Sequence, residues 1–377
     1  MGASRSVLSS GRVHEDFDQV RFAFDAMLLE DRGFSAQLAV YREGELVVDL
    51  AGGPHLGRED LTGVYSVSKG LAGLVVALLL EGGVLDLDEK VTRWWPEFAA
   101  HGKGEVTLRQ LCSHQVGVVG MDEPFTLEEY VDTERAAARL ALEPPSWRPG
   151  TAFGYHQRTL GIALEEIVRR ATGRTLQRFY DEEIRVPAGI DAYLGLPAEL
   201  EGRYVPVIPD QDDGAGRAVL AGSWAGVARN SGGESLALAA NIPALRRSGL
   251  CSSAGVASAE GIARAYAAAT TGVDGRAPLL TRETVLQVAE QQVWGIDRVI
   301  EQIAGFGIVF QKPSAANPFG GQRAFGHDGA GGALGFADPS IGLAFGYVPA
   351  PYESPSAEGR GTRLARAVHE AVGLLGS

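Results

Sequence analysis

The segments with strand character lie at the two ends of this 377-residue chain, and that placement constrains the fold most strongly. Residues 34–50 carry apolar side chains on both sides of Glu43-Gly44, a pair typical of a hairpin turn. Near the other end, two short alternating runs, residues 333–337 and 343–348, flank a segment with turn-forming residues. We therefore predict that the first and last strands pair in one antiparallel sheet.

Helical periodicity dominates between these ends. Apolar residues recur at spacings of three and four in residues 160–173, 255–270 and 281–292, and also in the flanking segments 15–30 and 362–375. Hydrophobic residues make up 45% of the chain and charged residues 21%, which predicts a large packed core rather than disorder. The expected fold class is α/β (α+β), an antiparallel β-sheet flanked by helices with an inserted, mostly helical domain.

The same reasoning gives domain boundaries. Residues 1–90 and 293–377 are expected to form the α/β sheet domain, and residues 91–292 the mostly helical domain, with the active site in the cleft between them. Residues 209–235 are rich in Gly, Asp and Ser and show little periodicity. They are predicted to form a long surface loop or lid.

The overall charge narrows the range of partners. With 34 basic and 47 acidic residues, the formal net charge is −13, which argues against binding to nucleic acid or to anionic membranes. The longest strongly apolar run, Gly70–Leu80, is too short to span a bilayer as a helix, and the N-terminal residues lack the apolar core of a secretion signal. We expect a cytoplasmic protein that acts on small molecules, and the sequence leaves its oligomeric state open.

Neither the cysteines nor the histidines indicate a metal or a cofactor. Cys112 and Cys251 are the only cysteines, and both are expected to be buried thiols. The seven histidines show no spacing of the kind that zinc sites use. No glycine-rich phosphate-binding motif lies between a strand and a helix, so the sequence predicts no metal and no cofactor.

A serine and a lysine stand three residues apart where a strongly apolar segment begins. Ser66 and Lys69 would share one face of a helix that ends near Gly82. Serine needs a base to act as a nucleophile, and lysine is such a base when burial lowers its pKa. The helix N-terminus would offer free N–H groups to an oxyanion. Taken alone, the pattern is better explained by helix capping through Ser66 or Ser68, with the lysine extended to solvent.

Two further segments carry polar groups suited to a reaction site. Tyr155 follows a Pro-Gly turn just before a helix, where a phenol can exchange protons in a cleft, and Gln157 can donate its amide to a carbonyl. Residues 326–332 read GHDGAGG, in which the glycines permit close backbone approach and His327 is ionisable. Each feature alone is more simply a structural tyrosine, a polar first-turn residue or a glycine-rich turn.

Together, the three segments resemble the serine β-lactamase and penicillin-binding-protein superfamily, and most of all its class C-like branch with its esterases. The motifs occur in the family's order: Ser66-Val67-Ser68-Lys69 for Ser-x-x-Lys, Tyr155-His156-Gln157 for Tyr-x-Asn in part, and His327-Asp328-Gly329 for the His-x-Gly of the esterases. Flanking segments such as VTLRQLCSHQVGV are also similar to family segments. The resemblance covers roughly residues 15–375.

The resemblance implies a role for each of these residues. Ser66 would be the acylated nucleophile. Lys69 would take its proton, or hold the electrostatics so that Tyr155 does, and Tyr155 would pass that proton to the leaving group. The backbone N–H groups of Ser66 and Ala330 would form the oxyanion hole.

The resemblance also implies substrate contacts for Gln157, His327 and Gly329. Gln157 replaces the usual asparagine and His327 the usual lysine, which puts recognition of a β-lactam or a peptide in doubt. The predicted function is therefore a serine carboxylesterase that works through an acyl-enzyme on small esters. The alternatives are an acyltransferase that passes the acyl group to an alcohol or amine, and a β-lactamase or D-amino-acid peptidase. A non-catalytic scaffold is disfavoured because all three reactive side chains are present.

Overall fold

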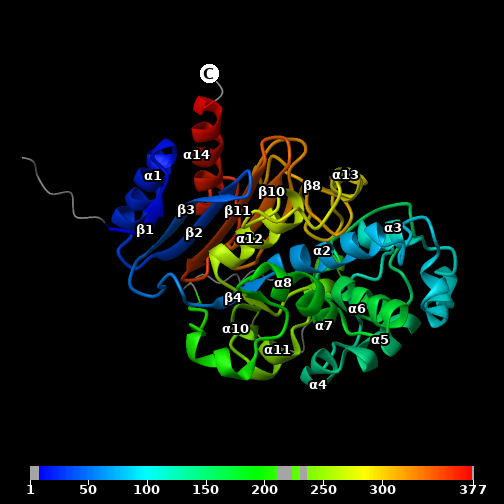
Figure 1. Ribbon diagram of the computed structural model, residues 1–377. Helices are drawn as coiled ribbons and strands as arrows, with labels where there is room; N and C mark the ends of the chain where they lie inside the picture. The colour runs from blue at the N-terminus through cyan, green and yellow to red at the C-terminus, as the bar shows by residue number, and fades with distance from the viewer. Residues whose placement is uncertain (1–7, 210–222, 230–235, 376–377) are drawn as a thin grey trace, which may run out of the picture.

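Both ends of the chain contribute strands to one six-stranded antiparallel sheet, as Figure 1 shows for the computed structural model, which describes residues 8–209, 223–229 and 236–375. The strand order is β1-β3-β2-β11-β10-β9. The bounds are β1 (Ser10–Val13), β2 (Ser35–Arg42), β3 (Glu45–Gly52), β9 (Phe325–Asp328), β10 (Leu334–Asp338) and β11 (Leu343–Ala350). β2 pairs with β11 along the whole of both strands, so the predicted pairing of the chain's two ends is confirmed.

The hairpin between β2 and β3 turns where the sequence predicts it. Glu43 and Gly44 both have positive φ, 49° and 84°, the backbone that two-residue hairpin turns require. The two sides of β2 then pack into different apolar clusters, with Leu38 and Val40 on one face and Ala39 and Tyr41 on the other. Both faces of the sheet are therefore covered.

Two helices from opposite ends of the chain cover one face of the six-stranded sheet. Helices that lie between them in the sequence cover the other face. α1 (Asp18–Glu30) and α14 (Arg360–Leu375) share the first cluster with the sheet. α2 (Val67–Glu81) and α12 (Ala259–Thr270) pack in the second, larger cluster, which continues into the helical part of the molecule (Figure 1). The predicted fold class is confirmed by this arrangement.

The helical part is built mainly from short helices. The α-helices are α3 (Leu108–Cys112), α4 (Leu127–Val131), α5 (Thr133–Leu142), α6 (Thr159–Thr172), α7 (Leu176–Tyr180), α8 (Val186–Ala188), α9 (Trp224–Arg229), α10 (Leu236–Ala239), α11 (Pro243–Ser248) and α13 (Arg282–Ala289). Tighter or wider single turns occur at η1 (Glu15–Phe17), η2 (Val91–Arg93), η3 (Pro96–Gly102), η4 (Asp181–Arg185) and η5 (Ala198–Arg203). Cys112 and Cys251 are both buried free thiols, as expected.

Several short strands were not predicted from the sequence. They are β1 at the edge of the large sheet, the small sheet of β4 (Thr62–Tyr65), β5 (Ala192–Tyr193) and β6 (Gly255–Ala257), and the hairpin of β7 (Val293–Ile296) and β8 (Ile303–Phe306). The helix expected over residues 255–270 therefore begins only at Ala259, where Ser258 accepts a hydrogen bond from the N–H of Gly261. Strands this short carry too little alternation to be recognised.

The predicted loop or lid at residues 209–235 falls mostly on residues outside the described part. Where it is described, residues 224–229 form α9, so a continuous loop is wrong there. The helix expected over residues 281–292 is confirmed but ends at Ala289.

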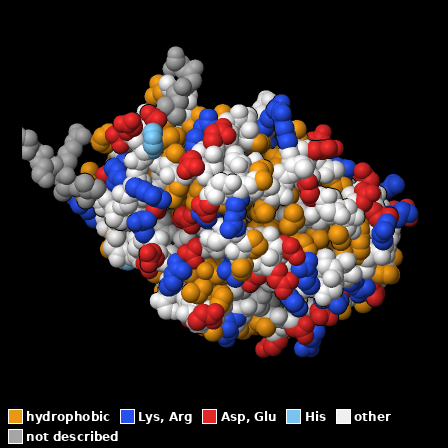
Figure 2. Space-filling view, in the orientation of Figure 1, with side chains coloured by type: hydrophobic (Ala, Val, Ile, Leu, Met, Phe, Trp, Pro, Cys, Tyr) orange, Lys and Arg blue, Asp and Glu red, His pale blue; other side chains and the backbone are white. Residues whose placement is uncertain are grey.

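Charged side chains of both signs are interspersed over the face of the molecule seen in Figure 2. No single basic patch dominates this face, which agrees with the net charge of −13. Among the described residues, every helix falls short of the length and apolarity that a bilayer crossing demands.

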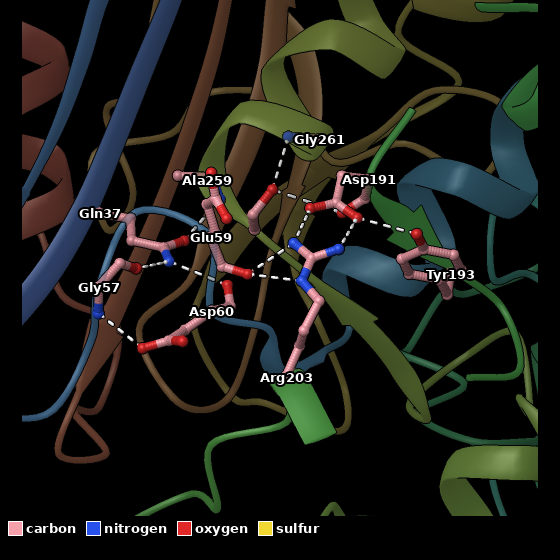
Figure 3. A network of polar contacts seen from close by, with 10 residues as sticks. Gln37, Gly57, Glu59, Asp60, Asp191, Tyr193, Arg203, Ala259 and Gly261 are labelled. Carbon is pink, nitrogen blue, oxygen red and sulfur yellow. Dashed lines mark hydrogen bonds and ion pairs between the residues drawn. The ribbon is translucent and has the colours of Figure 1, made fainter. Parts of the chain in front are cut away.

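A polar network fixes the chain just before β4 (Figure 3). Gln37 of β2 donates to the carbonyl oxygens of Gly57 and Asp60, at 2.5 and 2.9 Å, and accepts from the N–H of Ala259 at 2.9 Å. On the other side, Arg203 donates to the carbonyl oxygen of Glu59 at 2.8 Å and pairs with the carboxylate of Asp191. The large sheet, α12 and the helical part are thereby tied to the strand that leads into α2.

Candidate active site

Ser66 stands at a sharp turn between β4 and α2. The residue before it, Tyr65, has a positive φ of 49°, which is unusual for a bulky residue and marks a strained turn. Ser66 is the N-cap residue of α2, yet its side chain makes no capping hydrogen bond. The hydroxyl instead hydrogen-bonds with the side chains of Lys69 and Tyr155, so the capping explanation is wrong for Ser66.

Lys69 is fully buried one turn into α2. Its Nζ lies 3.1 Å from Ser66 Oγ and donates to the main-chain oxygens of Gln157 and Ser252, each at 2.7 Å. The alternative explanation, in which this lysine extends to solvent, is therefore wrong. Burial lowers the pKa of Lys69 to about 7, because the charged amine loses its hydration. The amine is thus partly neutral near pH 7.

Tyr155 reaches the same hydroxyl from a different part of the chain. Its phenol donates to Ser66 Oγ at 2.8 Å, and its ring stacks on Phe306 of β8 at a centroid distance of 5.9 Å. Burial raises the pKa of Tyr155, and the carboxylates of Asp328 and Asp297 raise it further. At neutral pH, Tyr155 is therefore a proton donor rather than a phenolate.

His327 lies behind Tyr155 on β9, with the two ring centroids 5.8 Å apart. It is fully buried, and its Nδ1 lies 2.7 Å from the carbonyl oxygen of Asp328, so we assign the proton to Nδ1. Burial and the nearby Lys69 lower the pKa of His327 to about 3. Desolvation therefore keeps this ionisable side chain neutral near pH 7.

The glycine-rich segment after β9 passes close to β4. A Cβ on Gly329 would lie 2.3 Å from the carbonyl oxygen of Val64, and a Cβ on Gly331 would lie 2.9 Å from the ring of Tyr65. Only glycine allows the two backbones to approach this closely. The intervening residue, Ala330, packs against the cluster that contains Tyr65. The segment predicted to supply the second N–H group therefore lies beside the turn that carries Ser66.

Gln157 enters the site through its backbone rather than through its amide. Its main-chain oxygen accepts from Lys69 Nζ, and the residue as a whole is half-buried. Contact between its side chain and a substrate stays a prediction. Ser252, whose carbonyl oxygen holds the same amine, was not identified from the sequence. A main-chain contact of this kind leaves no signal in residue type.

His114 is a second residue that sequence reasoning passed over. It adopts a positive φ of 63° and is fully buried between the rings of Phe306 and Tyr155, at centroid distances of 4.4 and 5.2 Å. Its Nδ1 accepts from the N–H of His156 at 3.0 Å, and its carbonyl oxygen accepts from the N–H of Gly154 at 3.1 Å. These two bonds fix the residues on either side of Tyr155. The only signal was its place in the flanking segment VTLRQLCSHQVGV.

The described residues contain no group of three or more His, Cys, Asp or Glu side chains that could hold a metal ion. What the site does contain is a serine hydroxyl within hydrogen-bond reach of both a lysine amine and a tyrosine phenol. Together with the sheet and helices around it, this arrangement defines the class of serine enzymes that have the β-lactamase fold.

The chain belongs to the Beta-lactamase family, whose sequence model matches residues 23–369. Among curated proteins, it is 31% identical to the esterase/beta-lactamase LipL of Mycobacterium tuberculosis, over 86% of this chain and 79% of that protein. Among solved structures, it is similar to EstA from Arthrobacter nitroguajacolicus Rue61a, with 46% identity, a TM-score of 0.95 and coverage of 98% and 100% of the two chains. A family VIII carboxylesterase matches with 31% identity, a TM-score of 0.88 and coverage of 96% and 99%.

Proposed function

We propose that this chain is a serine carboxylesterase that forms an acyl-enzyme on Ser66. One observation carries the proposal: Ser66 Oγ lies 3.1 Å from the amine of Lys69 and 2.8 Å from the phenol of Tyr155. A hydroxyl held between a base and an acid is what acylation and deacylation need. The similarity to relatives named as esterases supports esters as the substrate class.

In the acylation step, neutral Lys69 takes the proton of Ser66, and Oγ attacks the carbonyl carbon of the ester. The carbonyl electrons move onto its oxygen, which the N–H groups of Ser66 and Ala330 stabilise. The C–O bond to the alcohol then breaks, and the alcohol oxygen leaves with a proton from Tyr155. Tyr155 recovers its proton from Lys69.

Deacylation follows the same path in reverse with water. Tyr155 passes its proton to neutral Lys69 and takes one from water, whose oxygen attacks the acyl carbon. The bond to Ser66 Oγ then breaks as Lys69 returns the proton to Oγ. The carboxylic acid is released and the enzyme returns to its starting protonation state. The assignment of the base to Lys69 is supported by the two pKa directions, because a pKa of about 7 suits a base whereas the raised pKa of Tyr155 does not.

Neutral His327 disfavours the β-lactamase and peptidase alternatives. A histidine with a pKa of about 3 supplies no fixed cation for the carboxylate of a β-lactam or a peptide. We propose that His327 and Gln157 contact the ester or orient Tyr155, and that Gly329 lets the backbone approach it. Turnover of nitrocefin at rates comparable to those of simple esters would overturn this preference.

We further propose that the substrate is a free small molecule and that the protein works in the cytoplasm. Two buried thiols that do not pair with each other are compatible with a reducing compartment. The division into residues 1–90 with 293–377 and residues 91–292 is proposed as well, with Ser66 and His327 on the sheet side of the cleft and Tyr155 on the helical side.

The experiment that tests the proposal combines mass spectrometry with kinetics. After treatment with a fluorophosphonate, we expect one adduct, on Ser66, and Ser66→Ala should lower kcat for p-nitrophenyl butyrate by a factor on the order of 10⁶. Ser10→Ala, in the exposed edge strand β1, is the matched control and should keep wild-type activity. An adduct on another serine, or an active Ser66→Ala variant, would reject Ser66 as the nucleophile.

A further inference from the structure

A hairpin loop lies against the backbone of Tyr155. The loop joins β7 to β8, and Phe306 of β8 stacks on the ring of Tyr155. Within the loop, the N–H of Arg298 donates to the carbonyl oxygen of Phe153 at 3.2 Å, and Val299 packs in one apolar cluster with Tyr155. The hairpin therefore contacts both the ring of this tyrosine and the backbone that leads into it.

Asp297 begins this loop and is fully buried. Its Oδ1 accepts from the N–H groups of Val299 and Ile300, at 2.7 and 3.0 Å, and these two bonds close the turn. The other oxygen, Oδ2, is buried and accepts no hydrogen bond from any described residue. An asparagine would close the same turn without burying an unbonded carboxylate oxygen, so the turn alone does not explain the aspartate.

The N–H of Tyr155 faces the carboxyl group of Asp297. The peptide bond between Gly154 and Tyr155 is trans, so this N–H points opposite to the carbonyl oxygen of Gly154. That oxygen lies 2.7 Å from Nδ1 of His156, and the N–H therefore points away from the histidine ring. Burial raises the pKa of the Asp297 carboxyl, and the N–H groups around it, including that of Tyr155, oppose the rise.

We propose that Asp297 is a positioning residue for Tyr155. Its Oδ1 holds the loop, and its Oδ2 faces the N–H of Tyr155, a contact that shortens to a hydrogen bond when the phenol delivers its proton. Hydrogen bonds of active sites are often long without substrate and shorten in the reacting complex. A displacement of about 1 Å costs up to about 10²-fold in rate, so a small shift of this backbone slows the reaction. This inference rests on the proposed role of Tyr155 as the acid.

Both oxygens of the carboxylate are needed in this arrangement. An asparagine side chain has one acceptor oxygen, and its NH₂ group only donates. In Asp297→Asn, the oxygen therefore either closes the turn with Val299 and Ile300 or accepts from Tyr155, and the NH₂ group is left facing an N–H donor. A residue that only closes the turn tolerates this substitution, whereas a residue that also holds Tyr155 does not.

The test compares Asp297→Asn with the same substitution in a second turn. For Asp297→Asn, we expect kcat for p-nitrophenyl butyrate to fall by about tenfold to about 10²-fold with KM nearly constant, because the turn still forms while Tyr155 is displaced. Asp86→Asn is the matched control, since Asp86 is exposed and its Oδ1 accepts from the N–H of Asp88 at 2.9 Å. Its kcat should equal that of the wild type. A wild-type kcat in folded Asp297→Asn would overturn the proposal.

A measurement on the wild-type enzyme tests the contact even if Asp297→Asn does not fold. In protein made with ¹⁵N-labelled tyrosine, the amide signal of Tyr155 is assigned by its absence in Tyr155→Phe. Reaction with a fluorophosphonate should move this amide proton downfield, because its hydrogen bond to the carboxylate shortens. An unchanged or upfield signal would overturn the proposal. In that case wild-type hydrolysis, the Ser66 adduct and the loss of activity in Tyr155→Phe persist, whereas their absence would reject the proposed function itself.

Discussion

Two buried lysines, Lys69 and Lys103, show how similar surroundings lead to different roles. Both are fully buried, and both amines donate to two main-chain carbonyl oxygens. For Lys103 these belong to Ala100 and Glu143, at 2.9 and 2.6 Å. Burial lowers the pKa of Lys103 to about 8 and that of Lys69 to about 7. A depressed pKa is therefore not enough to identify an active-site lysine.

What separates the two lysines is the third neighbour of the amine. Both amines lie over an aromatic ring, 4.8 Å from the Tyr155 centroid for Lys69 and 5.3 Å from the Phe98 centroid for Lys103. Lys69 also has the hydroxyl of Ser66 beside it, at 3.1 Å. An aromatic ring stabilises an ammonium ion but accepts no acyl group. Lys103 thus joins two parts of the helical region, while Lys69 is poised to exchange a proton.

The largest expected difference between the two lysines is in the rate of ester hydrolysis after each is replaced. Lys69→Met should lower kcat/KM for p-nitrophenyl butyrate by a factor on the order of 10³ or more, because nucleophile and base act as a unit. Lys103→Met should change it by less than about threefold per folded molecule, since its amine touches no reacting group. Steady-state kinetics on both variants, corrected for the folded fraction by circular dichroism, would refute the distinction if the losses were equal.

Tyr155 and Tyr180 allow the same comparison between a residue of the active site and a structural one. Burial raises the pKa of both Tyr155 and Tyr180, but the hydroxyl of Tyr180 donates to the carbonyl oxygen of Ala192 at 3.1 Å, away from Ser66. We expect Tyr155→Phe to lower kcat by about 10²-fold or more, as for loss of a general acid, and Tyr180→Phe to leave it nearly unchanged. Normal turnover by Tyr155→Phe would remove the phenol from the mechanism.

His114 should act by positioning Tyr155. An asparagine tolerates positive φ and places its Oδ1 where the histidine has Nδ1, so His114→Asn can still accept from His156 N–H. His114→Ala loses both features, and a displacement of the tyrosine by about 1 Å costs up to about 10²-fold in rate. We expect kcat to fall in the alanine variant with KM nearly constant, and to recover in the asparagine variant. Equal kcat values in the two variants would show that the ring only fills space.

The smallest expected effect is the change of kcat/KM with pH. Only the neutral amine of Lys69 accepts the proton of Ser66, and the neutral fraction grows as pH rises through its pKa of about 7. Therefore kcat/KM should fall about tenfold per pH unit below pH 6 and level off above pH 8. A pH–rate profile measured with p-nitrophenyl butyrate checks this, and Lys103→Met should give the same curve. A rate that does not change between pH 5 and pH 8 would exclude Lys69 as the base.

The sequence alone determined the longer helices, the strands on either side of Glu43-Gly44 and after residue 333, and which ends of the chain pair. The Glu43-Gly44 turn and the alternating runs after residue 333 encode their backbone locally, and the structure agrees with both. It was the family resemblance, more than the residues themselves, that selected Ser66, Lys69 and Tyr155, because each motif in isolation favoured a structural explanation. The short strands β1 and β4 to β8 carried too little alternation of apolar and polar residues to be found.

Only the tertiary structure decided the electrostatics and the shape of the site. The pKa of Lys69 follows from burial among carbonyl oxygens of Gln157 and Ser252, which are distant from it in the sequence. His327 is neutral for the same reason, although its residue type allows either charge state near pH 7. Desolvation and cavity volume depend on which side chains surround a group in space, whereas the pattern along a chain specifies only its local backbone and its buried face.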